Sequence, residues 1–142
     1  MNRYIALLTT STAALLIMAP LAIAQGLNLT IEGVRNAKGS VIVMVFDSAK
    51  GYNNLDWSKA IDLAELPAKP GKLTHRFSNL NAGPYAVLLF HDENGDQDLN
   101  YTGNTLHEGT GASNVTARNQ YPNFAEAAVP PGNVTVRLYY DK

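Results

Sequence analysis

Hydrophobic and polar residues alternate along three segments of the chain, the pattern of a strand with one buried face. These segments are Leu27–Ile31, Leu73–Phe77 and Val134–Tyr140. Two further segments, Ser40–Phe46 and Tyr85–Phe90, are apolar on both faces and rich in residues that favour strands. A strand of this kind is covered on both sides, so we expect these two at the centre of a sheet.

Turn signals rich in glycine, proline and asparagine separate these segments, and no long amphipathic helix pattern competes with them. Ile61–Leu66 is compatible with a short strand or with one helical turn. A long connection, His91–Pro130, precedes the last strand; Asn123–Ala128 within it is compatible with a helical turn. The pattern predicts an all-β protein, a single antiparallel β-sandwich of about seven strands.

The N-terminal segment has the features of a secretory signal. Arg3 is followed by the apolar run Ile5–Ala24, which ends in Ala-Ile-Ala, with small residues where a signal peptidase cleaves. A retained membrane anchor is the alternative, but Pro20 and four hydroxyl residues interrupt the run. We expect residues 1–24 to be cleaved, leaving one domain of residues 25–142 with no membrane span. The expected location is periplasmic or secreted.

Composition narrows the choice of partners and of chemistry. The chain has no cysteine, which excludes disulfides and thiolate metal sites. The chain has 11 basic and 12 acidic residues, and the predicted signal contains one basic residue, Arg3, and no acidic residue. Without the signal, the net charge is −2 (10 − 12). Neither nucleic acid nor anionic lipid is therefore an expected partner. Between Phe77 and Ala117 there are acidic residues but no lysine or arginine, so the acids there lack counter-charges along the sequence.

The segment H-D-E-N-G-D-Q-D-L-N, directly after the second apolar strand, places oxygen-bearing side chains at every second position. A hard cation such as Ca²⁺ binds six to eight oxygen ligands, and a tight loop of alternating Asp and Asn can supply them. The spacing begins like an EF-hand loop, but Gln97 and Gly103 stand where that motif needs glycine and glutamate. The predicted calcium ligands are Asp92, Asn94, Asp96, Asp98, Asn100 and Glu108.

A solvated turn is the alternative to a calcium site, because Asp, Asn and Gly favour turns without any metal. Magnesium is less favoured than calcium, since it prefers few carboxylates and several waters. The histidines, His75, His91 and His107, do not have the spacing of a zinc site. A small hydrolase using His91, Asp92 and Glu108, and a carrier for an apolar ligand, remain alternatives. We favour a binding module over an enzyme.

A group of motifs resembles one bacterial family. G-P-Y-A-V, H-D-E-N-G, E-G-T-G-A-S-N and N-F-A-E-A-A-V are together similar to exported proteins of the domain of unknown function family 2141. The resemblance implies an exported single-domain protein without an established activity. Thr105–His107 and Asn100 depart from the family pattern. The characteristic residues would correspond to Gly83, Tyr85, His91, Asp92, Asn94, Glu108, Gly109, Ser113, Asn114 and Phe124.

The segment F-S-N-L-N-A-G-P-Y-A-V is also similar to the strand–turn–strand of transthyretin-like sandwich domains. This likeness implies a prealbumin-like or immunoglobulin-like topology. The C-terminal sequence Leu138–Lys142 lacks the tail that carries the chemistry of transthyretin-related hydrolases, so their activity is not expected here. The combined prediction is an exported β-sandwich with a calcium-binding loop. Its partner would be an envelope protein, a glycan or a small molecule.

Overall fold

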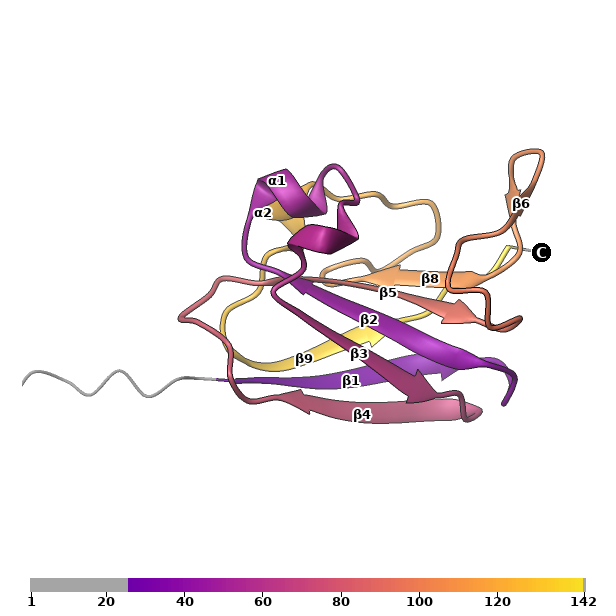
Figure 1. Cartoon of the computed structure of the whole chain (residues 1–142), viewed down its shortest axis with the longest axis horizontal. Helices are drawn as coiled ribbons and strands as arrows, with labels where there is room; N and C mark the ends of the chain where they lie inside the picture. The colour runs from indigo at the N-terminus through magenta and orange to yellow at the C-terminus, as the bar shows by residue number, and fades with distance from the viewer. Residues whose placement is uncertain (1–25, 142) are drawn as a thin grey trace, which may run out of the picture.

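The computed structural model of the chain describes residues 26–141, which form two facing β-sheets (Figure 1). The predicted signal, residues 1–24, lies outside this range. The first sheet contains β1 (Leu27–Val34), β4 (Gly71–Phe77) and β9 (Gly132–Arg137), in the order β4-β1-β9. The second contains β2 (Ser40–Phe46), β3 (Asp62–Pro67), β5 (Ala86–Asp92) and β8 (Gly109–Ala112), in the order β3-β2-β5-β8.

Short elements cover the ends and one outer face of this sandwich. A hairpin projects from one end and consists of β6 (Tyr101–Thr102) and β7 (Thr105–Leu106). The helical turns are α1 (Ala49–Tyr52), the 3-10 turn η1 (Trp57–Lys59) and α2 (Phe124–Ala127). Figure 1 shows α1 and α2 together on the outer side of the four-stranded sheet. Among the described residues, no helix has the length and hydrophobicity that a membrane crossing requires.

The burial of β1 and β2 follows from their hydrophobic patterns. In β1, Leu27, Leu29 and Ile31 are buried, whereas the residues between them are partly exposed. Every residue of β2 is buried. Val41, Val43 and Val45 face the core between the sheets. Ile42, Met44 and Phe46 point to the other face of the strand and pack beneath the helical turns. The prediction of a central strand covered on both faces is therefore confirmed for β2.

The register of the four-stranded sheet places the acidic loop. Strands β2 and β5 are antiparallel, with Ser40 opposite Asp92. Strand β8 is antiparallel to β5 on its other side, with His91 opposite Gly109. Glu108, which directly precedes β8, therefore lies beside Asp92 at the end of β5, although the two are separated along the chain.

The predicted all-β sandwich is confirmed, and the ambiguous segment Ile61–Leu66 forms most of strand β3. One pair of strands differs from the antiparallel expectation. β1 and β9 run parallel, with Leu27 opposite Gly132, while the other strand pairs of the described residues are antiparallel. A parallel pair needs a long connection, and here most of the domain lies between the two strands.

The glycine-rich segment Gly109–Ala112, which lies within the long connection His91–Pro130, is an edge strand. Its glycines permit close packing against the C-terminal part of the chain. A Cβ atom on Gly109 would lie 2.3 Å from the Tyr140 ring, and one on Gly111 would lie 2.4 Å from the carbonyl oxygen of Arg137. Because glycine is depleted in strands, the sequence pattern did not indicate this one.

The sandwich core predicts a large difference between two leucine truncations. Leu89 is fully buried between the sheets, so Leu89→Ala should lower the free energy of unfolding by about 2–5 kcal/mol. Leu63 is 52% exposed on β3, so Leu63→Ala should change it by no more than about 0.5 kcal/mol. Urea denaturation measures both. Equal effects of the two changes would contradict the assignment of the core.

Candidate metal centre

Asp92 organises the acidic loop from its base. The residue ends β5 and is fully buried. Its Oδ1 accepts a hydrogen bond from the backbone N–H of Gly95 at 2.7 Å, and its Oδ2 accepts one from that of Gln97 at 2.8 Å. Both donors have positive φ values, 77° and 60°, which turn the backbone around the carboxylate. Glycine adopts this conformation readily, while Gln97 adopts it at some cost.

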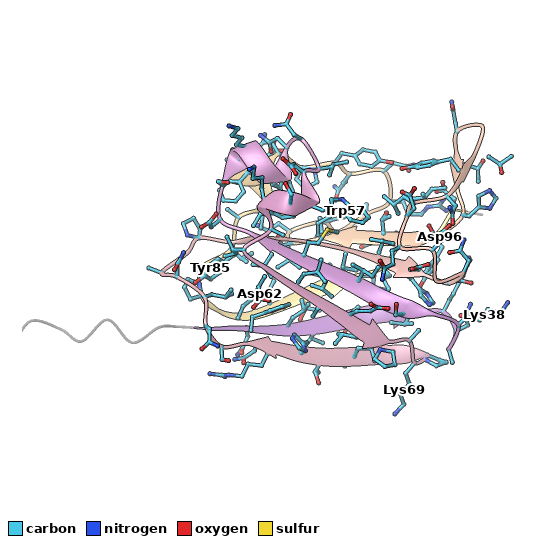
Figure 2. The ribbon with its side chains drawn as sticks, in the orientation of Figure 1. Lys38, Trp57, Asp62, Lys69, Tyr85 and Asp96 are labelled. Carbon is cyan, nitrogen blue, oxygen red and sulfur yellow. The ribbon has the colours of Figure 1, made fainter. Side chains whose placement is uncertain are left out.

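Asp96 lies at the exposed tip of the loop (Figure 2). Its Oδ2 accepts hydrogen bonds from the Nδ2 atoms of Asn94 and Asn100, both at 2.9 Å. Its Oδ1 accepts one from the backbone N–H of Asp98 at 3.0 Å. These bonds, with that from Asn100 the strongest influence, lower the pKa of the Asp96 carboxyl. The carboxylate is therefore charged and surrounded by donors.

Glu108, directly before β8, is the third carboxylate of the group. Only 3% of the residue is exposed, and its Oε2 accepts a hydrogen bond from the backbone N–H of Asn100 at 3.0 Å. Burial raises the pKa of the Glu108 carboxyl, and the negative charges of Asp92 and Asp96 raise it further, against the opposing effect of the Asn100 bond. Ionised Glu108 is therefore in an unfavourable environment as long as no cation neutralises the group.

The three carboxylates form one compact group. One oxygen from each of Asp92, Asp96 and Glu108 lies within 4.8 Å of those of the other two. Oxygens at about 2.3–2.6 Å from one calcium ion can lie up to roughly 5 Å apart, so a single ion could contact all three. Among residues 26–141, none of the ion pairs involves these carboxylates.

The remaining predicted ligands divide into two kinds. Asn94 and Asn100 border the group, with their Nδ2 atoms toward Asp96. Turning either amide over would present its oxygen instead, so both can serve as ligands. Asp98 is different, because its side chain accepts a hydrogen bond from the backbone N–H of Leu99 and lies outside the three-carboxylate group. The structure thus brings together three of the four predicted carboxylates.

Arg35 and Tyr140 support the loop from distant parts of the sequence. The Arg35 guanidinium pairs with Glu93 and donates to the carbonyl oxygen of His107 at 3.1 Å. It also lies 4.5 Å from the centre of the Tyr140 ring. Burial raises the pKa of the Glu93 carboxyl, but hydrogen bonds from Arg35 and Asn36 outweigh this and lower it. Arg35 therefore neutralises Glu93 and not the three-carboxylate group.

His91 is held by two hydrogen bonds in a fully buried position. Its Nε2 lies 2.8 Å from the carbonyl oxygen of Lys38, which can only accept, so Nε2 carries a proton. Its Nδ1 lies 2.9 Å from the Tyr140 hydroxyl, which donates to it in the neutral ring. With both nitrogens engaged, His91 has a structural role, which disfavours the alternative of a hydrolase that uses it as a base.

The other histidines and Ser113 are also accounted for by local contacts. His75 packs against Phe77 on β4, with ring centres 4.6 Å apart, and His107 contacts the Thr102 hydroxyl at 2.6 Å. Ser113 is buried, and its hydroxyl accepts from the N–H of Val87 and donates to the carbonyl of Ala127. Ser113 thereby links β5 to α2, a role that its position in the sequence did not reveal.

The fold and this loop define a β-sandwich domain with an acidic cluster at one end. The chain belongs to the bacterial family described as "Uncharacterized protein conserved in bacteria (DUF2141)", whose model matches residues 29–138. The predicted family membership is confirmed. Comparisons with curated proteins and with solved structures found no match. The transthyretin-like or immunoglobulin-like topology therefore stays a prediction.

The raised pKa of Glu108 predicts that Glu108→Gln stabilises the metal-free protein at neutral pH. A carboxyl group whose pKa is higher in the folded state than in the unfolded chain destabilises the fold as the pH rises above its unfolded-state pKa. Glutamine avoids this destabilisation and keeps a side-chain oxygen that accepts the hydrogen bond from Asn100. In EDTA, the thermal midpoint of the variant should lie above that of the wild type at about pH 7, and the two midpoints should be equal at about pH 4. A variant that is less stable at neutral pH would contradict this electrostatic account.

Proposed function

We propose that this protein is an exported calcium-binding module, with the ion held by the loop Asp92–Asn100 and by Glu108. The observation that carries the proposal is the group of three carboxylates, with oxygens within 4.8 Å and no ion pair to a described cationic side chain. Like charges at this distance repel unless a cation or water separates them. A bound divalent cation would convert this repulsion into attraction.

The chemistry of the donors favours calcium. Asp92, Asp96 and Glu108 supply carboxylate oxygens, and Asn94 and Asn100 can supply amide oxygens. Water would complete a shell of six to eight ligands. Magnesium is smaller, keeps more of its own water and needs a stricter octahedral arrangement, which a set of three carboxylates does not favour.

The ion would connect three parts of the chain that are separated along the sequence. Asp92 belongs to the end of β5 and Asp96 to the loop tip, and Glu108 directly precedes β8. Between the last two lies the β6–β7 hairpin. Calcium would therefore fix the hairpin and the long connection relative to the sheet, together with the surface that they display.

Export is supported by the sequence of the N-terminal segment. The apolar run Ile5–Ala24 with its Ala-Ile-Ala end is typical of a cleaved signal, and a location in the periplasm or outside the cell would follow. Extracellular calcium modules commonly have dissociation constants of roughly 0.1–1 mM for calcium. A weak site of this kind would suit such a location. The role proposed there is that of a binding or accessory protein of the cell envelope.

Calcium should raise the thermal midpoint of the purified protein. With a dissociation constant of about 0.1 mM, about 1 mM Ca²⁺ adds about 1.4 kcal/mol. That is a rise of roughly 4–8 °C relative to EDTA for a domain of this size. Asp96→Asn should abolish most of the rise, because Asp96 belongs to the carboxylate group. It is exposed, so the fold should survive the change.

Asp98→Asn is the matched control, since it removes the same charge from the same loop but outside the group. It should leave the calcium-induced rise intact. An equal rise with Mg²⁺ would contradict selectivity for calcium. The absence of a rise with either ion, or its persistence in Asp96→Asn, would contradict the site itself.

A further inference from the structure

A second candidate site lies on the outer face of the four-stranded sheet. It is a partly enclosed hollow of about 570 Å³, bounded by the helical turns on one side and by the β6–β7 hairpin and the segment 115–123 on the other. Pockets for small molecules typically measure roughly 300–1,000 Å³. We refer to this hollow, with Met44 and Leu88 in its floor and Trp57, Tyr101 and Tyr121 around it, as the aromatic hollow.

The floor of the aromatic hollow is an apolar row across the sheet. The strand register places Met44 beside Leu88, and Leu88 beside Ala112. All three line the hollow. Trp57 lies over the sheet beside this floor (Figure 2), with its ring centre 5.4 Å from that of Phe90. A ligand that enters the hollow would therefore contact hydrocarbon and aromatic surface at its base.

Most of the exposed large hydrophobic residues of the described chain lie in the walls of the hollow. Four large hydrophobic residues of the described chain are exposed, and three of them line the hollow: Leu55, Tyr101 and Tyr121, exposed by 55%, 59% and 86%. Scattered apolar residues are ordinary on a protein surface, but their convergence on one concave site is typical of a binding site. Covering them with a ligand would remove apolar surface from water.

The charge of the hollow favours an uncharged ligand. Within the described part of the chain, Arg118 and Asp141 are the only charged residues that line it, and they form an ion pair at 2.7 Å. A charged ligand would lose hydration without finding a free counter-charge. Asn104 and Asn119 also line the hollow, and an asparagine amide can form hydrogen bonds to a hydroxyl or carbonyl group.

We propose that the aromatic hollow binds an uncharged, mainly apolar small molecule that carries one polar end group. The apolar floor would hold the hydrocarbon part, the tyrosines would cover it and the amides would contact the polar end. This site is distinct from the calcium loop, because none of the three carboxylates Asp92, Asp96 and Glu108 lines it. A saccharide is less well matched, because Met44, Leu88 and Ala112 in the floor offer no strong hydrogen-bond partner for its hydroxyl groups.

The test uses N-phenyl-1-naphthylamine, an uncharged apolar dye whose emission rises in apolar surroundings. Titration of the purified protein should give a saturable signal, with energy transfer from Trp57, the only tryptophan of the chain. 1-Octanol should displace the dye at concentrations at least about fivefold lower than octanoate, since the carboxylate would lack a counter-charge. Glucose should not displace it.

Three variants test the position of the site. Leu88→Gln should weaken dye binding about tenfold, because it places a polar group in the floor. Tyr121→Ala should weaken it about threefold, and this residue is too exposed for its loss to unfold the protein. The matched control is Leu63→Gln, since Leu63 lies opposite Met44 in the same row but outside the hollow. It should bind within about twofold of the wild type.

Several results would overturn the proposal. A dye signal that does not saturate would mean that the hollow has no site. Wild-type binding by both Leu88→Gln and Tyr121→Ala would place the dye elsewhere. Equal competition by octanol and octanoate would contradict the uncharged ligand, and displacement by glucose would replace it with a saccharide. If Leu88→Gln fails to fold, Tyr121→Ala decides the question alone.

Discussion

The pairing of β2 with β5 is the interaction on which the rest of the structure depends. Both strands are largely buried on both faces, so their side chains supply two different interiors. Val43 and Leu89 face the core of the sandwich, while Met44 and Phe90 belong to the cluster under the helical turns. The same pairing places Asp92 at the end of β5, opposite Ser40, where the acidic loop begins.

Residues 99–101, at the end of the acidic loop, contact both the three-carboxylate group and the aromatic hollow. Leu99 and Tyr101 line the hollow. Asn100, between them, donates its backbone N–H to Glu108 and its side-chain amide to Asp96. Alternate residues thus contact the two regions. The β6–β7 hairpin begins at Tyr101, so it forms a wall of the hollow and is also anchored beside the carboxylates.

Much of the fold could be predicted because its central strands carry strong local patterns. Ser40–Phe46 and Tyr85–Phe90 are apolar on both faces, and the structure buries them in this way. Gly109–Ala112 could not be recognised, because its glycines serve close packing against Tyr140 and Arg137 and leave no hydrophobic alternation. The parallel pairing of β1 with β9 is likewise invisible in either strand alone.

The sequence predicted the acidic residues of the candidate site, but not how they are arranged in space. The spacing of Asp92, Asn94 and Asp96 indicated a loop around a cation, yet the same spacing made Asp98 equivalent to them, and the structure places it outside the group. Glu108 joins the group because β8 returns beside β5, which local sequence does not show. Arg35 and Tyr140 were missed because their contacts with Glu93 and His91 arise only in the folded chain.

The most direct measurement is a calcium titration of the metal-free, ¹⁵N-labelled protein, followed by amide NMR. Asp92 holds the N–H groups of Gly95 and Gln97, and Glu108 holds that of Asn100, so an ion at these carboxylates must change all three environments. We predict saturable shifts of these amides at a single site, with much smaller shifts in equal Mg²⁺. Unchanged loop amides, or shifts scattered over the domain without saturation, would contradict a calcium site.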